Sequence, residues 1–272
     1  MADADLLGRV CATYEGYLAL GNQWSESSGA CFVTSPDAPR IYDANHACRL
    51  RAGTPDAVEA VLAEAERRFA GLGYRRFHTD PLTPAAFEAR LALEGFESES
   101  ELELLLQGAL RATAPAVRIR RAESDTDWEA IYRLNRLDHT EEEAADERLR
   151  GVYPEEVTRQ IVGRRRAKGP ALSTWLVEED GVDCAFLSSW PGANGVGKVE
   201  DLFTHPDFRR RGIATALLVH GVADCRRRGA LEVLIGARPQ DTPKALYAAL
   251  GFRPFCLVRG WLKRIDLDAT GP

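Results

Sequence analysis

The sequence has little that would mark a membrane protein, a secreted protein or a nucleic-acid-binding protein. Its net charge of −6 argues against a dominant surface for nucleic acid or anionic lipid. No apolar run approaches the roughly 18 residues of a membrane-spanning helix, and the acidic start MADADLL lacks the basic region and apolar core of a secretion signal. We therefore expect a cytoplasmic protein whose partners include no nucleic acid and no membrane, with a homodimer left open.

The sequence also lacks the common metal and nucleotide signatures. Its six cysteines form no CxxC pair, its five histidines form no HExxH motif, and neither type clusters at metal-ligand spacing. Several cysteines lie in apolar stretches, so we expect buried, reduced thiols and no metal site. The GxGxxG fingerprint of dinucleotide-binding folds and the GxxxxGK[ST] phosphate loop are absent as well.

Length and composition indicate two globular domains. The chain has 272 residues, of which 45% are hydrophobic and 28% charged, and single domains usually hold about 100 to 200 residues. A stretch of small residues, QGALRATAP at 107–115, ends in Ala-Pro, and an alternating strand pattern begins directly after it. We therefore divide the chain into domains 1–114 and 115–272.

Hydrophobic periodicity predicts an α/β (α+β) fold for the second domain, with a mixed, mostly antiparallel sheet flanked by helices. Asp180-Gly181 separates two apolar strands and supplies the positive φ of a tight hairpin turn. Gly251 directly follows a short helix, and its tolerance of the left-handed conformation favours a helix end there. The expected strands are 117–120, 173–178, 182–190, 198–204, 231–237 and 256–264, and the expected helices are 128–137, 154–166, 211–228 and 243–250.

The first domain repeats this order faintly at an offset of about 156 residues. At this offset Gly73 falls under Gly229, and Gly95 falls under Gly251. We interpret the chain as two tandem copies of one fold, of which the N-terminal copy is degenerate. The elements expected in that copy are the helices 55–70 and 84–93 and the strands 74–80 and 98–106.

The most informative segment is the loop that follows the expected strand 198–204. The amides and the dipole of a helix N-terminus favour an anion. Gly212 leaves room for a close backbone approach, small Ala214 continues it, and the arginines at 209–211 add positive charge. This R-x-x-G-x-A loop suits a pyrophosphate.

In its context the loop resembles the pyrophosphate loop of the GCN5-related N-acetyltransferase (GNAT) superfamily, Q/R-x-x-G-x-G/A, between a strand and a helix. The segment LFTHP at 202–206 is similar to the family pattern, and LYAALGF at 246–252 looks like its LYxxxGF signature. The resemblance covers residues 117–264. It implies the acyl-CoA N-acyltransferase fold, with acetyl-CoA as co-substrate and no metal.

The resemblance also implies direct attack of a substrate amine on the acetyl thioester within a ternary complex. Tyr247 matches the position that protonates the departing CoA thiolate. Glu200 matches the position of the base that takes the proton of the amine, and strand alternation directs Asp201 to the opposite face. The implied cofactor-binding residues are Leu202, Phe203, Thr204, Arg209, Arg210, Arg211, Gly212, Ile213, Ala214 and Thr215.

Two neighbouring residues and one departure temper this assignment. His205 titrates near neutral pH but precedes proline, a position more typical of a turn residue. Trp190 is either a wall of the acceptor pocket or a core residue. Many family members carry an asparagine where this chain has Gln-Asp-Thr at 240–242, which affects how the cofactor arm is held.

The N-terminal copy lacks the cofactor equipment. At the offset of about 156 residues, an aspartate, Asp56, replaces Gly212 and would repel phosphate, and Leu91 replaces Tyr247. The expected activity is therefore acetyl transfer at a single site to a primary amine of a small molecule or protein. A non-catalytic acyl-CoA-binding sensor and an interaction module remain as alternatives, although a pure sensor needs neither Tyr247 nor Glu200.

Overall fold

The computed structural model describes residues 2–113, 115–239 and 243–266. They divide into two compact units: unit 1 holds the described residues of 1–103, 236–241 and 254–272, and unit 2 those of 104–235 and 242–253. The last strand of the chain therefore belongs to unit 1. The domain boundary expected after residue 114 lies inside unit 2, and the division into independent domains stays a prediction.

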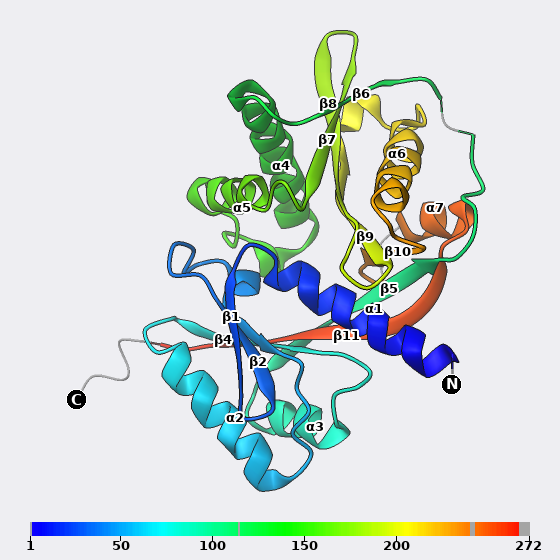
Figure 1. The fold of residues 1–272 in the computed structure, drawn as a ribbon. Coiled ribbons are helices and arrows are strands. Elements are labelled where there is room, and N and C mark those ends of the chain that lie inside the picture. The colour runs from blue at the N-terminus through cyan, green and yellow to red at the C-terminus, as the bar shows by residue number, and fades with distance from the viewer. Residues whose placement is uncertain (1, 114, 240–242, 267–272) are drawn as a thin grey trace. The chain divides into compact units, whose positions relative to one another are not determined.

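Unit 1 is a sheet with helices packed on it (Figure 1). Its strands have the order β1-β2-β3-β4-β11; β3 and β4 pair in parallel, and the other neighbours pair antiparallel. Phe32, Phe77, Phe87 and Trp261 share a buried core with apolar residues of α2 and α3. The elements are α1 (Ala2–Ala19), β1 (Gln23–Ser27), β2 (Ala30–Thr34), η1 (Tyr42–Ala44), β3 (His46–Cys48), α2 (Pro55–Arg68), β4 (Tyr74–Thr79), α3 (Ala85–Leu93) and β11 (Arg253–Arg264), and β5 (Glu97–Leu106) leads on into unit 2.

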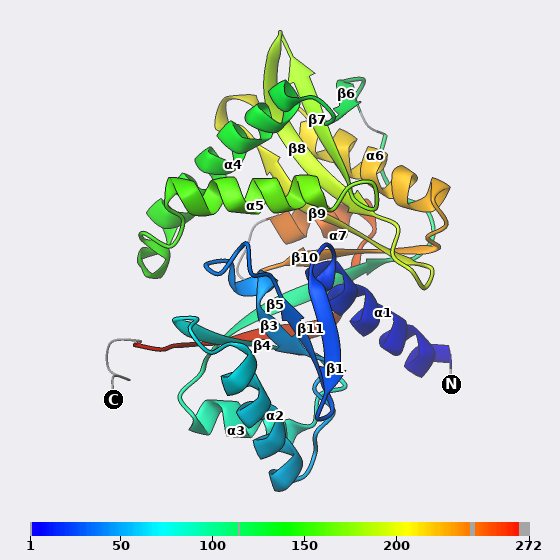
Figure 2. The same ribbon diagram turned by 60° about the vertical axis from the view of Figure 1, so that its left-hand side comes forward.

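Unit 2 has its own sheet segment, with helices on both faces (Figures 1 and 2). The strand order is β10-β9-β8-β7-β6, antiparallel except for the parallel pair β9 and β10. On one face Ile131 of α4 shares a core with Leu176 and Phe186; on the other, Gly221 lets α6 approach Leu187 closely. The elements are β6 (Arg118–Arg121), α4 (Asp125–Ala145), η2 (Glu147–Leu149), α5 (Glu155–Ala167), β7 (Ser173–Glu179), β8 (Val182–Trp190), β9 (Val196–Thr204), η3 (Pro206–Phe208), α6 (Ile213–Arg227), β10 (Glu232–Ala237) and α7 (Pro243–Leu250).

The expected helices and strands are confirmed, with some changes of length. The hairpin turn between β7 and β8 has φ of +54° at Asp180 and +77° at Gly181, as Asp-Gly predicts. The helix expected at 128–137 is longer and begins after Ser124, whose side chain and Asp127 form a reciprocal capping box. The acidic run 141–143 therefore lies within α4.

The element order recurs along the chain near the offset found in the sequence. α2, β4, α3 and β5 correspond in order to α6, β10, α7 and β11. This agreement is one of order and type. The interpretation of the N-terminal part as a degenerate second copy stays a prediction.

Candidate active site

The pairing of β9 changes along its length. β9 pairs in parallel with β10 from Val196 to Val199, and its continuation, residues 200–204, pairs with β8 on the other side. Among the described residues, no pair with β10 follows Val199. In the described part of the chain, the recorded pairing of β9 with β10 therefore ends at Val199, while its pairing with β8 continues to Thr204.

A β-bulge interrupts β9 at Glu200, the predicted base, and the neighbouring Asp201. The register with β8 shifts between Phe186 and Ser188, and Asp201 has a φ of +60°. The side chain of Asp201 contacts Arg165, so it lies on the face of β9 that α5 covers. Val199 packs against α6 on the opposite face, and the next residue, Glu200, therefore lies on the same face as Asp201. The expectation that Asp201 points to the face opposite Glu200 is wrong, because the left-handed residue breaks the alternation of the strand.

The two carboxylates have different partners. Asp201 forms two contacts of 3.0 Å with the Arg165 guanidinium. Burial alone would raise the pKa of the Asp201 carboxyl, but Arg165 and a hydrogen bond from Ser188 hold it below its ordinary value. Glu200 lies 2.9 Å from the ammonium group of Lys198, whose side chain is buried. Asp201 is thus a weak base fixed to α5, and Glu200 is held in a separate ion pair.

The loop after β9 is supported by its own arginines. Arg209 donates to the carbonyl oxygen of Thr204 at 2.9 Å and pairs with a carboxylate of α4. Arg211 donates to the carbonyl oxygen of Asp207 at 2.9 Å, and Arg210 has a φ of +65°. The side chains of Arg209 and Arg211 are about half exposed. They hold the loop conformation and keep positive charge beside the start of α6.

The N-terminus of α6 has the geometry expected of an anion site. Its N-cap is Gly212, with φ +82° and ψ 2°, which has no side chain to bond the first amides. The first recorded helical bond runs from the Ala216 amide to the Gly212 carbonyl. A Cβ at Gly212 would lie 2.9 Å from the ring of Pro115. Glycine is therefore favoured both by its conformation and by the close approach, and the role of the amides of residues 213–215 as a pyrophosphate site stays a prediction.

Other predicted site residues lie in α7 and at the end of β9. Tyr247 is buried in α7, with its ring 6.3 Å from that of Phe252. Phe203 is buried with Phe186 in the core under α4, so only its backbone faces a ligand edge, and Leu202 is half-buried. The departure from the family pattern at 240–242 lies outside the described residues.

The two side chains of uncertain role have structural partners. His205 accepts a hydrogen bond from the Asp207 amide and caps the short helix η3. This is the turn role that its position before proline predicts. Trp190 is 9% exposed, and its carbonyl oxygen lies 3.3 Å from the Cys225 sulfur, as in a core residue.

One carboxylate that sequence reasoning missed lies on α4. The Arg165 guanidinium donates to Asn135 at 3.2 Å, which places this side of α4 beside the bulge of β9. One turn further on, Asp138 interacts electrostatically with both Arg165 and Asp201. Burial, followed by the nearby Glu142, raises the pKa of the Asp138 carboxyl to about 7. A sequence signal existed only as an acidic residue in an amphipathic helix, which is too common to single it out.

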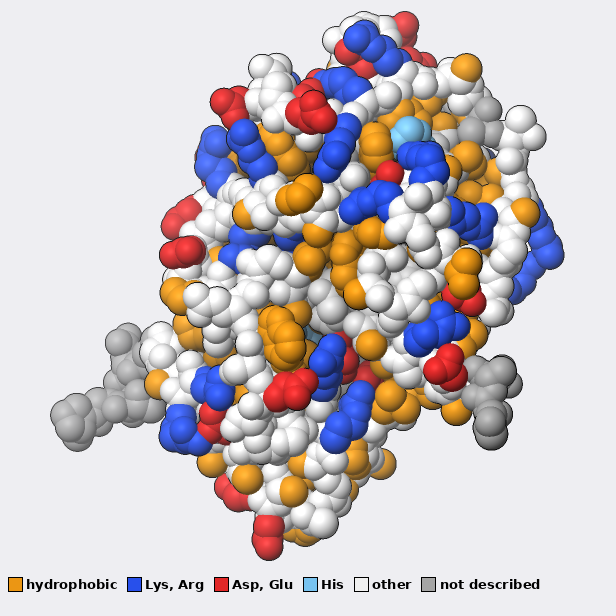
Figure 3. Space-filling model, viewed as in Figure 1, with side chains coloured by type: hydrophobic (Ala, Val, Ile, Leu, Met, Phe, Trp, Pro, Cys, Tyr) orange, Lys and Arg blue, Asp and Glu red, His pale blue; other side chains and the backbone are white. Residues whose placement is uncertain are grey.

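The surface carries both basic and acidic side chains (Figure 3). On the face shown in Figure 3, basic side chains are spread over unit 2, the upper part of the view. No group of three or more His, Cys, Asp or Glu side chains in the described part of the chain is arranged to hold a metal ion. None of the described helices is both long and apolar enough to cross a membrane.

Known proteins share both sequence and fold with this chain. Residues 128–252 match the model of the acetyltransferase (GNAT) family. An uncharacterized N-acetyltransferase of Methanocaldococcus jannaschii is 32% identical over 85 residues, which cover 30% of this chain and 37% of that relative. The chain thus spans little more than a third of this relative's length.

Solved structures extend the likeness in fold to nearly the whole chain. A GCN5-related N-acetyltransferase from Kribbella flavida superposes with a TM-score of 0.68 at 14% identity, covering 95% of each chain. A tandem GNAT protein from the clavulanic acid biosynthesis pathway gives a TM-score of 0.60 at 17% identity, covering 89% of this chain and 79% of its own. The mixed, mostly antiparallel sheet flanked by helices is shared with these proteins.

Proposed function

Because residues 128–252 belong to the acetyltransferase (GNAT) family, we propose that this chain is an N-acetyltransferase acting on a primary amine. Acetyl-CoA is the donor, and the acceptor is a small molecule or a protein. The observation that carries the proposal is the glycine N-cap at the start of α6, which has no side chain to bond the first amides and follows β9 through a short loop rich in arginine. A pyrophosphate can accept hydrogen bonds from such amides.

The backbone binds the donor in this proposal. The amides and carbonyls of Leu202, Phe203 and Thr204 pair with the pantetheine arm as a neighbouring strand would. The amides of Ile213, Ala214 and Thr215 donate to the pyrophosphate, and the partial positive charge of the helix N-terminus adds to their effect. Arg209, Arg210 and Arg211 supply further charge without needing to contact the phosphate directly.

The chemistry then requires one base and one acid. A free alkyl amine titrates near 10, so a carboxylate, Glu200 or Asp138, first removes the proton of the ammonium group. The amine nitrogen attacks the thioester carbon, the carbon–sulfur bond breaks to give the CoA thiolate, and the nitrogen loses a second proton to solvent as the amide forms. The Tyr247 hydroxyl donates a proton to that sulfur.

Isothermal titration of acetyl-CoA into the full chain tests the donor site. We expect saturable binding at one site per chain, and loss of binding in Gly212→Glu, because the new side chain carries negative charge into the anion site. Two sites per chain would show that the N-terminal copy also binds the donor. Absence of binding would overturn the proposal.

Release of CoA thiol in the presence of a panel of primary amines tests the transfer step. Turnover with an amine that is abolished by N-acetylating that amine beforehand supports an N-acetyltransferase. Tight acetyl-CoA binding without turnover on any small amine or lysine-bearing peptide would instead favour an acyl-CoA sensor.

A further inference from the structure

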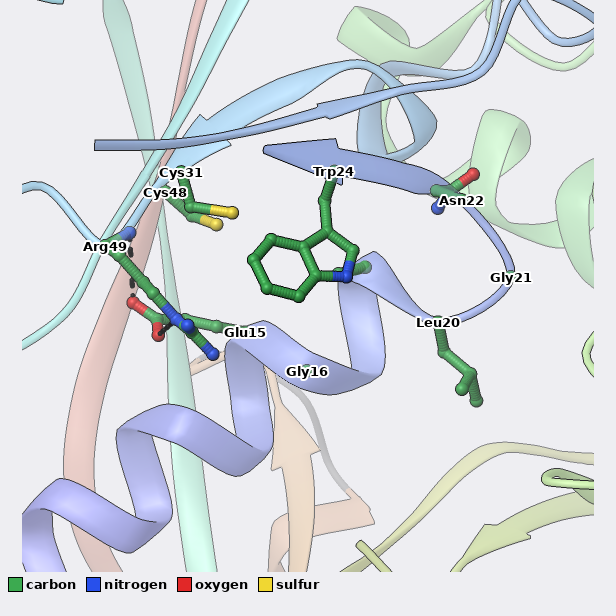
Figure 4. A pocket seen from close by; sticks show the side chains of 10 residues that line it. Glu15, Gly16, Leu20, Gly21, Asn22, Trp24, Cys31, Cys48 and Arg49 are labelled. Atoms are coloured by element: carbon green, nitrogen blue, oxygen red, sulfur yellow. Dashed lines mark hydrogen bonds and ion pairs between the residues drawn. The ribbon is translucent and has the colours of Figure 1, made fainter. Parts of the chain in front are cut away.

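Two cysteines of unit 1 face each other across neighbouring strands. Cys31 of β2 and Cys48 of β3 are directly opposite in the antiparallel register. Such residues have Cβ atoms about 4.5 to 5.5 Å apart, and a disulfide needs about 3.5 to 4.5 Å. Closing a bond therefore requires an approach of only about 1 Å. Figure 4 shows the two sulfur atoms side by side, above α1.

The pair is buried but lines a hollow of the surface. Cys31 and Cys48 both border a cavity of about 270 Å³, together with Trp24 and Arg49 (Figure 4). Cys31 also borders an adjoining cavity of about 510 Å³. A space of roughly 15 Å³ on this measure admits a water molecule, so both cavities have room for a small solute beside Cys31, which is itself 3% exposed. Trp24, 56% exposed, is the outermost large side chain of the first cavity.

The surroundings of the two thiols shift their pKa values in opposite directions. A hydrogen bond from the Cys48 thiol, aided by the Arg49 guanidinium, lowers the pKa of Cys31 below its ordinary value. The same hydrogen bond, together with burial, raises the pKa of Cys48 above its ordinary value. Arg49 is held in place by Glu15, which accepts from its backbone amide at 3.1 Å and its Nε at 3.0 Å. Cys31 borders both cavities, whereas Cys48 borders only the first, so Cys31 is the thiol placed to react as the thiolate.

We propose that Cys31 and Cys48 form a redox site that takes hydrogen peroxide and closes to a disulfide. The Cys31 thiolate attacks one peroxide oxygen, the O–O bond breaks, and the departing hydroxide takes a proton to become water. The Cys48 sulfur, losing its proton, then attacks the sulfenic acid of Cys31 and displaces a second water. Two thiols are oxidised and one peroxide is reduced. This site is independent of acetyl transfer.

The test is oxidation of the reduced full-length chain with hydrogen peroxide, followed by mass spectrometry without reductant. We expect the intact mass to fall by two hydrogens, and a peptide map to link Cys31 to Cys48. Dithiothreitol should restore the starting mass. Because the wild-type chain is used, no variant has to fold for the main result.

Two variants sharpen the result. Cys48→Ser should stop at a sulfenic acid on Cys31 that dimedone traps, because the resolving thiol is gone. Cys256→Ser removes the half-exposed thiol and should leave the disulfide yield unchanged. The proposal is overturned if Cys31 and Cys48 stay reduced while Cys256 oxidises, or if peroxide links either of them to a different cysteine.

Discussion

Replacing Gly212 by alanine isolates the conformation of the anion loop from its charge. The residue has a φ of +82°, and a left-handed conformation costs a residue with a Cβ about 1 to 2 kcal/mol. The new Cβ would also lie 2.9 Å from the Pro115 ring, so either the ring or the loop must shift. If the loop relaxes, binding must restore it, and about 2 kcal/mol then corresponds to a roughly 30-fold weaker acetyl-CoA affinity.

Isothermal titration of acetyl-CoA measures this change directly. The matched control is Gly229→Ala, which follows the C-terminus of the same helix at φ +105° and has no atom within 4 Å of its would-be Cβ. Because its backbone strain is similar, Gly229→Ala should lower the free energy of unfolding by a similar amount. It should leave the affinity for acetyl-CoA unchanged. The reasoning is refuted if Gly212→Ala binds acetyl-CoA like the parent, or if both variants lose affinity equally.

Three further variants test other parts of the site. Tyr247→Phe should lower kcat by roughly 100-fold without changing acetyl-CoA affinity, as expected for loss of a general acid; unchanged turnover would remove Tyr247 from that role. Asp138, with a pKa of about 7, is one candidate for the base. If it acts as the base, kcat/KM should rise with pH through about 7 as the carboxyl loses its proton, and Asp138→Asn should abolish this rise. An unaltered pH profile in Asp138→Asn would exclude Asp138 as the base. Arg165→Met leaves the Asp201 carboxylate without its guanidinium and should lower the free energy of urea unfolding by about 3 kcal/mol. Adding Asp201→Asn should largely reverse this loss. If Arg165→Met is as stable as the parent, the ion pair is unimportant for stability.

Local signals made the backbone turns predictable from the sequence, including the one at the start of α6. Gly212 and Gly251 each mark a point where the backbone adopts positive φ, and Asp180-Gly181 marks a hairpin. Such residues act within a few positions of themselves, so their effect needs no knowledge of distant contacts. The same is true of the alternating strands and of the helices that follow their caps.

Non-local features could not be predicted in the same way. The last strand, β11, reads like its neighbours in the sequence, yet it pairs with β4 and packs Trp261 into the core of unit 1. Cys31 and Cys48 lie in segments that carry no pairing signal, and only the register of β2 and β3 brings them together. Pairing between distant segments depends on the packing of whole faces, which single positions do not reveal.

The bulge at Asp201 changes which side of β9 its carboxylate faces. Regular alternation would have left one carboxylate facing the substrate, whereas the positive φ turns Glu200 and Asp201 to the same side of β9. Because Arg165 keeps Asp201 ionised, Asp201 cannot take a proton efficiently near neutral pH, but its negative charge contributes to the raised pKa of Asp138. In the mechanism that we propose, removing the proton of the amine thus falls to Asp138 or to Glu200. The two assignments differ in one observable, since Asp138 as base gives a rate that rises through a pH of about 7.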